Sequence, residues 1–124
     1  MRFAEYIEEA SRTDADLGGD MDDMHHIVGI LTELGELADP FKKWIAYRKE
    51  KDLVNVKEEL GDMMWYIGCL CKKYDFDMEE ILDKNIAKLR ARYPEKFDTE
   101  KAQNRDLNAE RKILEGTPVE TDRV

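Results

Sequence analysis

Two four-residue stretches of one pattern, an acid, Leu, Gly and a second acid, most constrain what this chain can fold into. They occupy residues 33–36 and 59–62. In an α-helix, residues three apart lie on one side, so each stretch projects two carboxylates from one side of a helix. The residues between the stretches suffice for a helix end, a connection and a new helix start. Two such helices packed side by side bring four carboxylates together: Glu33, Glu36, Glu59 and Asp62.

This carboxylate cluster repels itself unless protons or cations neutralise it. Hard oxygen donors at such density suit Mg²⁺ or Mn²⁺. One pair of acids at this spacing arises by chance among 29 acidic residues, but two copies with the same Leu-Gly interior are more specific. Gly35 and Gly61 each cost about 1 kcal/mol relative to Ala in a helix interior. That cost indicates that another helix or a ligand approaches closely at these glycines.

Composition narrows the fold class and the partners. With 124 residues the chain has the size of one domain, and its 40% charged residues and three prolines favour an all-α fold. The net charge of −9 argues against binding a nucleic acid polymer, which needs a basic face. We see no long apolar run and no charged-then-apolar leader, so we expect a cytoplasmic protein that does not bind a membrane. Cys69 and Cys71 point to different sides of one helix, so we expect reduced thiols.

Apolar residues at helical spacing predict the helices. We expect them over residues 3–12, 21–38, 53–74 and 78–92, with a mobile loop at residues 13–20. They form a four-helix-bundle-like core. Pro40 ends or kinks the second helix, and residues 41–47 then form a short helical segment. Residues 98–114 can form a peripheral helix, followed by a loose tail.

The third helix is apolar almost all round, which predicts that it is central and buried and that the protein is an oligomer. His25 and His26 are expected to be polar residues near a helix start that face water, although a substrate contact by His25 is the alternative. Tyr66 lies one turn after Asp62 on the carboxylate side. It is therefore the best candidate among the aromatic residues for stacking on a base.

A polar stripe lies along the fourth predicted helix. It consists of Asn85, Lys88 and Arg92. Two interpretations remain open for this stripe: a solvated face, or an edge that faces phosphate groups.

The two acidic stretches, Glu33-x-x-Glu36 and Glu59-x-x-Asp62, resemble the metal signature of the MazG-like nucleotide pyrophosphohydrolases of the all-α NTP pyrophosphatase superfamily. The flanking residues 34–39, 58–62 and 88–94 agree with that pattern, and residues 97–115 resemble the C-terminal extension of small MazG-like proteins. The resemblance covers most of the chain. It implies a helical catalytic domain over residues 1–94 and a charged, partly helical extension over residues 95–124.

The resemblance further implies hydrolysis of a (d)NTP to a (d)NMP and pyrophosphate, with Mg²⁺ or substituting Mn²⁺, in a homodimer or homotetramer. Cleaning of the nucleotide pool is the cellular role it suggests. By motif position, the four carboxylates of the cluster are the expected metal ligands. Tyr66 and Trp44 resemble base-contacting aromatic residues, although Pro40 interrupts the stretch before Trp44. Asn85 and Lys88 match polar positions of the last core helix.

The chemistry fits the residues independently of the resemblance. Attack of water on a phosphate chain needs charge neutralisation more than covalent help. Carboxylate-held metal ions supply that neutralisation and activate a water, whose proton a spare oxygen of Glu33 or Glu36 can take. A nucleophilic triad is therefore not needed, and the sequence has no Gly-rich phosphate loop of the GxxxxGK type.

Two other classes of protein remain as alternatives. A di-iron carboxylate bundle uses Glu-x-x-His pairs, and no Glu of this chain has His three residues later. A non-enzymatic, oligomeric helical interaction module would carry the acids as surface charges. It predicts neither metal-dependent stabilisation nor nucleotide turnover.

Overall fold

The computed structural model of the chain describes residues 1–116. These residues contain six α-helices and no strand, which confirms the all-α class. The chain divides into two compact units, Met1–Phe76 and Asp77–Val124. Among residues 1–116, none of the helices combines the length and the apolar character that a membrane-spanning segment requires.

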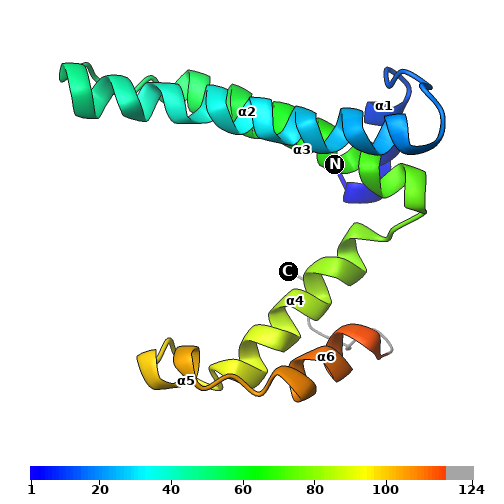
Figure 1. Cartoon of the computed structure of the whole chain (residues 1–124), viewed down its shortest axis with the longest axis vertical. Coiled ribbons are helices and arrows are strands. Elements are labelled where there is room, and N and C mark those ends of the chain that lie inside the picture. The colour runs from blue at the N-terminus through cyan, green and yellow to red at the C-terminus, as the bar shows by residue number, and fades with distance from the viewer. Residues whose placement is uncertain (117–124) are drawn as a thin grey trace. The chain divides into compact units, whose positions relative to one another are not determined.

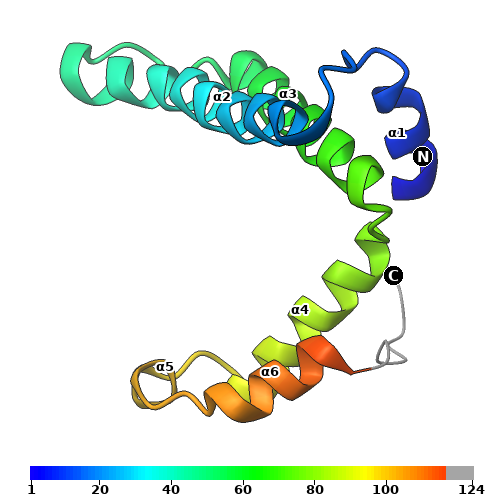
Figure 2. The same ribbon diagram turned by 45° about the vertical axis from the view of Figure 1, so that its right-hand side comes forward.

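The first unit consists of α1 (Phe3–Ser11), α2 (Gly19–Tyr47) and α3 (Leu53–Tyr74). Figures 1 and 2 show α2 and α3 side by side in opposite directions, joined by the connection that follows Tyr47. Helix α3 packs against both α1 and α2, which confirms its predicted central place within this unit. The predicted bounds of the third helix are also confirmed at both ends.

Glycines set the closest approaches within the first unit. A Cβ atom at Gly68 of α3 would lie 3.3 Å from the ring of Tyr6, so α1 lies close against α3 there. Gly18 and Gly19 have φ angles of 81° and 50°. These left-handed values favour glycine and turn the chain from the loop into α2.

Helix α2 does not end at Pro40, as one reading of the sequence had it, but continues to Tyr47 with the proline inside it. A proline in a helix removes only its own backbone donor and clashes with the preceding turn. The expected helical segment over residues 41–47 is confirmed as part of α2. The helix ends at Arg48, whose φ of 56° is left-handed.

The second unit contains α4 (Met78–Arg92), α5 (Thr99–Gln103) and α6 (Leu107–Glu115). Asp77 caps the start of α4, because its carboxylate accepts from the backbone N–H groups of Glu79 and Glu80. Helix α6 packs against α4.

The single helix predicted over residues 98–114 is wrong, because a second cap at Asp106 divides the segment into two helices. Asp98 accepts from the N–H of Lys101 and starts α5, and Asp106 accepts from the N–H of Ala109 and starts α6. The predicted tail begins at the end of α6, and its residues 117–124 lie outside the described residues. The predicted domain boundary at residue 94 stays a prediction.

Candidate metal centre

Three of the four predicted carboxylates come together between α2 and α3. One oxygen from each of Glu33, Glu59 and Asp62 lies within 4.8 Å of the other two. Glu59 and Asp62 are three residues apart on α3, and Glu33 faces them from α2. Glu59 is only 5% exposed, whereas Asp62 is open to solvent. We refer to these three residues as the carboxylate cluster of the structure.

The electrostatics of the carboxylate cluster are those of acids held too close for all to ionise. The pKa of Glu33 is raised from 4.5 to about 7, first by its hydrogen bond with Glu59, then by burial and by the charges of Asp62, Glu59 and Glu36. The side-chain amide of Asn55 donates to Glu59 Oε1 at 3.2 Å, which fixes one oxygen of that carboxylate. A proton on Glu33 therefore partly neutralises the cluster.

Glu36, the fourth predicted ligand, lies outside this group of three. It is exposed on the next turn of α2, yet close enough for its charge to raise the pKa of Glu33. The close helix approach inferred at Gly35 and Gly61 is not found between the described residues. A Cβ atom at either position would meet nothing within 4 Å.

The donor set of the carboxylate cluster fits a hard divalent cation. Carboxylate oxygens are the ligands that Mg²⁺ and Mn²⁺ prefer, and three acids at this separation gain from a cation that replaces the shared proton. Asp62 is exposed, so this edge of the carboxylate cluster is open to solvent. The side-chain amide of Asn55 does not belong to the donor set, but its hydrogen bond to Glu59 orients that carboxylate.

An aromatic group lies next to the carboxylate cluster on the same pair of helices. The ring of Tyr66 lies 4.9 Å from that of Trp65 and 5.7 Å from that of His25, both edge to face. Tyr66 therefore packs against two other rings at a position one turn from Asp62. Its predicted contact with a base stays a prediction.

The other predicted substrate residues lie elsewhere on the chain. Trp44 is 46% exposed near the end of α2, with Lys51 Nζ 4.0 Å from its ring centroid. Asn85, Lys88 and Arg92 all belong to α4 of the second unit. The guanidinium of Arg92 donates to Glu110 Oε1 at 2.7 Å, so a carboxylate of its own unit already neutralises it.

The sequence reasoning missed a second polar group in the first unit. His26 was expected to face water, but it is 1% exposed and its Nε2 lies 2.6 Å from Asp14 Oδ2. Cys69, also 1% exposed, approaches the same carboxylate. The spacing of these residues could have indicated this group. His26 lies two turns before Glu33 and Cys69 two turns after Asp62, so each lies on the same side of its helix as the predicted ligand.

Two of three comparisons with known proteins found a match for this chain. The family model of the MazG nucleotide pyrophosphohydrolase domain matches residues 24–97. The Gene 37 protein of Mycobacterium phage L5 is 33% identical over 72 residues, which cover 52% of this chain and 60% of the phage protein. No solved structure matches the chain. Because the matched residues make up more than half of the sequence and include the carboxylate cluster, the chain belongs to the MazG nucleotide pyrophosphohydrolase domain family.

Proposed function

We propose that the protein is a Mg²⁺-dependent nucleoside triphosphate pyrophosphohydrolase, which converts a (d)NTP and water to a (d)NMP and pyrophosphate. The observation that carries this proposal is the convergence of Glu33, Glu59 and Asp62 from two antiparallel helices. Members of the MazG family act on nucleoside triphosphates and generally depend on divalent cations. Mn²⁺ is the expected substitute for Mg²⁺.

Glu33, Glu59 and Asp62 would hold the metal, with Glu36 as a further ligand from the next turn. When bound, Mg²⁺ neutralises charge on the phosphate chain and lowers the pKa of a water. To hold the cation, the carboxylates would give up their shared proton. Spare oxygens of Glu33 or Glu36 would then be able to accept the proton of the attacking water. This assigns Glu33 and Glu36 both a ligand role and a general-base role.

The remaining residues are proposed to bind and orient the nucleotide. Tyr66 lies one turn from Asp62 and presents a π-face suited to a base, and Trp44 is a second aromatic candidate. Asn85 and Lys88 on α4 offer donors to phosphate oxygens, and Arg92 would do so with guanidinium N–H groups other than the Nε–H that Glu110 accepts. We further propose that the protein is a cytoplasmic homodimer or homotetramer that cleans the nucleotide pool.

A panel of nucleotides, assayed for release of pyrophosphate with and without Mg²⁺, tests the proposal. We expect turnover only with the metal. Asp62→Asn removes one ligand oxygen charge and should lower turnover by well over tenfold, because changing even a partner of a metal ligand costs about 10–100-fold. Glu58→Gln is the matched control, since Glu58 is exposed beside Glu59 and lies outside the carboxylate cluster. Its turnover should equal that of the wild type.

The non-enzymatic interaction module makes the opposite forecast. It expects no pyrophosphate from any nucleotide and the same melting temperature with and without Mg²⁺. Full turnover in Asp62→Asn would also reject the carboxylate cluster as the metal site. These two results can be told apart. Absence of pyrophosphate rejects the enzymatic function itself, whereas full turnover in Asp62→Asn leaves the function in place and rejects only the carboxylate cluster as its metal site.

A further inference from the structure

The most deeply buried large side chains among the described residues are His26 and Cys69, each 1% exposed. Both are of types that bind transition metals. One atom from each, together with one carboxylate oxygen of Asp14, lies within 4.8 Å of the other two. This Asp14–His26–Cys69 cluster is separate from the carboxylate cluster and mixes nitrogen, sulfur and oxygen donors.

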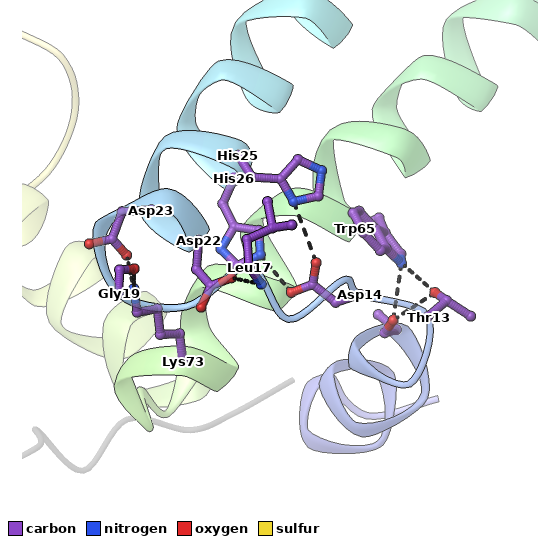
Figure 3. Close-up of polar contacts among 11 residues, drawn as sticks. Thr13, Asp14, Leu17, Gly19, Asp22, Asp23, His25, His26, Trp65 and Lys73 are labelled. Carbon is purple, nitrogen blue, oxygen red and sulfur yellow. Dashed lines mark hydrogen bonds and ion pairs between the residues drawn. The ribbon is translucent and has the colours of Figure 1, made fainter.

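The fold builds this second cluster from three segments. His26 on α2 and Cys69 on α3 face each other across the antiparallel pair, two turns along from Glu33 and Asp62. The loop after α1 supplies Asp14, and Figure 3 shows its carboxylate joined by dashed lines to both His25 and His26. The sequence thus places donors on two rigid helices and closes them with one loop residue.

The Trp65 indole holds the loop that carries Asp14. Its N–H donates to the backbone oxygen of Ala10 and to Thr13 Oγ1, both at 3.0 Å (Figure 3). Thr13 is the residue immediately before Asp14. The loop is therefore fixed to α3 next to the position from which Asp14 reaches His26.

Beside the bond between His26 Nε2 and Asp14 Oδ2, several polar atoms in and next to this cluster lack a hydrogen-bond partner. Asp14 Oδ1, His25 Nδ1 and His26 Nδ1 are buried and have no hydrogen-bond partner in the described part of the chain. Asp14 Oδ1 and His25 Nδ1 lie 3.6 Å apart, too far for a good hydrogen bond. Two ligands of one tetrahedral Zn²⁺, with bonds of about 2.0–2.1 Å, lie about 3.4 Å apart. Buried polar atoms without partners call for an explanation, and an absent ion is one of the established ones.

We propose that Asp14, His26 and Cys69 form a binding site for a borderline-soft divalent cation of the Zn²⁺ type, with His25 beside the fourth coordination position. A thiolate and an imidazole select Zn²⁺ over Mg²⁺, so the two clusters of this unit bind different metals. In the metal-free protein, protons occupy the same place. One lies between His26 Nε2 and Asp14 Oδ2, which are 2.6 Å apart, and the Cys69 thiol carries the other.

Binding exchanges these protons for the cation. A cysteine binds Zn²⁺ as the thiolate, so Cys69 would release its proton when it binds the cation. The bound ion would join the loop at Asp14 to both long helices. It would thereby fix the end of the α2–α3 pair that lies two turns from the carboxylate cluster.

Co²⁺ serves as the spectroscopic probe for this site. The full chain is stripped of metal under reducing conditions, saturated with Mg²⁺ to fill the carboxylate cluster, and titrated with Co²⁺. We expect one Co²⁺ per chain with a thiolate-to-cobalt charge-transfer band and the visible bands of a tetrahedral ion, all removed by added Zn²⁺. Cobalt bound without the thiolate band, or no binding beyond the carboxylate cluster, would overturn the proposal.

The two cysteines provide a matched pair of variants. Cys69→Ala should abolish the thiolate band, whereas Cys71→Ala should keep it, because Cys71 is equally a buried free thiol of α3 but lies outside the cluster. A band that persists in Cys69→Ala, or disappears in Cys71→Ala with its circular dichroism intact, rejects the assignment.

Asp14→Asn is the second test and does not depend on the folding of a cysteine variant. The amide keeps an oxygen near His26 but loses the charge, so Zn²⁺ affinity should fall by at least tenfold. An unchanged affinity excludes Asp14 as a ligand. Asp62→Asn should leave the cobalt spectrum unaltered, which separates this site from the proposed catalytic metal.

Discussion

The ring of Tyr66 lies directly against Gly29, so closely that a Cβ atom at position 29 would be 2.1 Å from Tyr66 Cε1. Gly29 lies one turn before Glu33 on α2, and Tyr66 lies one turn after Asp62 on α3. This contact therefore sets the separation of the two helices beside the carboxylate cluster. A helical glycine costs about 1 kcal/mol relative to Ala, a cost that the close approach explains at this position.

Gly29→Ala should destabilise the protein in spite of its better helix propensity. The new methyl group meets the Tyr66 ring, and overpacking of this kind costs about 1–3 kcal/mol. Gly35→Ala is the matched control two turns along α2, where a Cβ atom meets nothing within 4 Å. It should raise the free energy of unfolding by up to about 1 kcal/mol. Urea denaturation of the metal-free proteins measures the free energy of unfolding of each variant. Equal effects of the two changes would contradict the close contact between Tyr66 and position 29.

The predicted oligomer has a candidate surface on α2. Between residues 24 and 34 of this helix, five apolar side chains are each more than 40% exposed: Met24, Ile27, Val28, Leu31 and Leu34. Monomers rarely leave an apolar face of this kind uncovered, so we expect a second copy to bury it. Leu31→Glu should then lower the mass measured by light scattering to that of one chain, while Leu31→Met, which keeps the apolar volume, should not. If the wild type is already monomeric at micromolar concentration, a second copy does not bury this face of α2.

Apolar periodicity predicted much of the fold because it reports which side of a helix is buried. The predicted bounds of α3 and α4 and the facing of Glu33 toward Glu59 agree with the structure, and the apolar faces of these helices were part of that prediction. Periodicity does not report what covers the buried side. The burial of His26 depends on Asp14, which comes from a loop twelve residues earlier and reaches the helix only in the folded chain.

Local chemistry accounts for the other differences. Gly35 and Gly61 were interpreted as sites where another helix or a ligand approaches closely. The close contacts with rings of neighbouring helices lie at Gly29 and Gly68 instead, because such a contact depends on which large ring faces each glycine. Likewise, the cap at Asp106 breaks a segment whose composition favours one continuous helix. Such choices follow from single hydrogen bonds and single contacts, which a pattern over many residues does not resolve.

Helix α6 depends on a carboxylate shared by two guanidinium groups. Glu110 is 4% exposed and accepts from Arg92 Nε at 2.7 Å and from Arg105 Nη2 at 2.8 Å. The bonds from Arg92 and then Arg105 lower the pKa of Glu110 from 4.5 to about 2. Because the folded-state pKa is below the ordinary value, this stabilisation is complete above pH 4.5 and is lost as the pH falls toward 2.

Glu110→Gln should therefore speed amide hydrogen exchange across residues 107–115 at neutral pH, because it leaves two guanidinium groups without their charge partner. Glu115→Gln is the control, since Glu115 is an exposed partner of Arg111 on the same helix. An exposed pair of this spacing contributes little. If both variants exchange at the wild-type rate, the shared carboxylate does not hold α6.

The last prediction concerns the proton on Glu33. In the metal-free protein its pKa is about 7, above the ordinary 4.5, chiefly because of the hydrogen bond with Glu59. The folded state thus binds this proton more tightly than the unfolded chain does. Raising the pH from 4.5 to about 7 removes the proton and lowers the free energy of unfolding. Above that pH the ionised cluster repels itself, and the melting temperature of the metal-free protein should be lowest there.

Glu33→Gln should melt higher than the wild type above pH 7 without metal, because the neutral amide relieves the repulsion while keeping the shape. Mg²⁺ at a hundredfold excess over its Kd should raise the free energy of unfolding of the wild type by about 2.7 kcal/mol. It should raise that of the variant much less, because the variant has lost a ligand. Turnover should fall at the same time, so stability and activity move in opposite directions. Glu58→Gln should show neither change. A Glu33→Gln protein that melts lower without metal, together with a wild type indifferent to Mg²⁺, would make these acids structural and reject the metal centre.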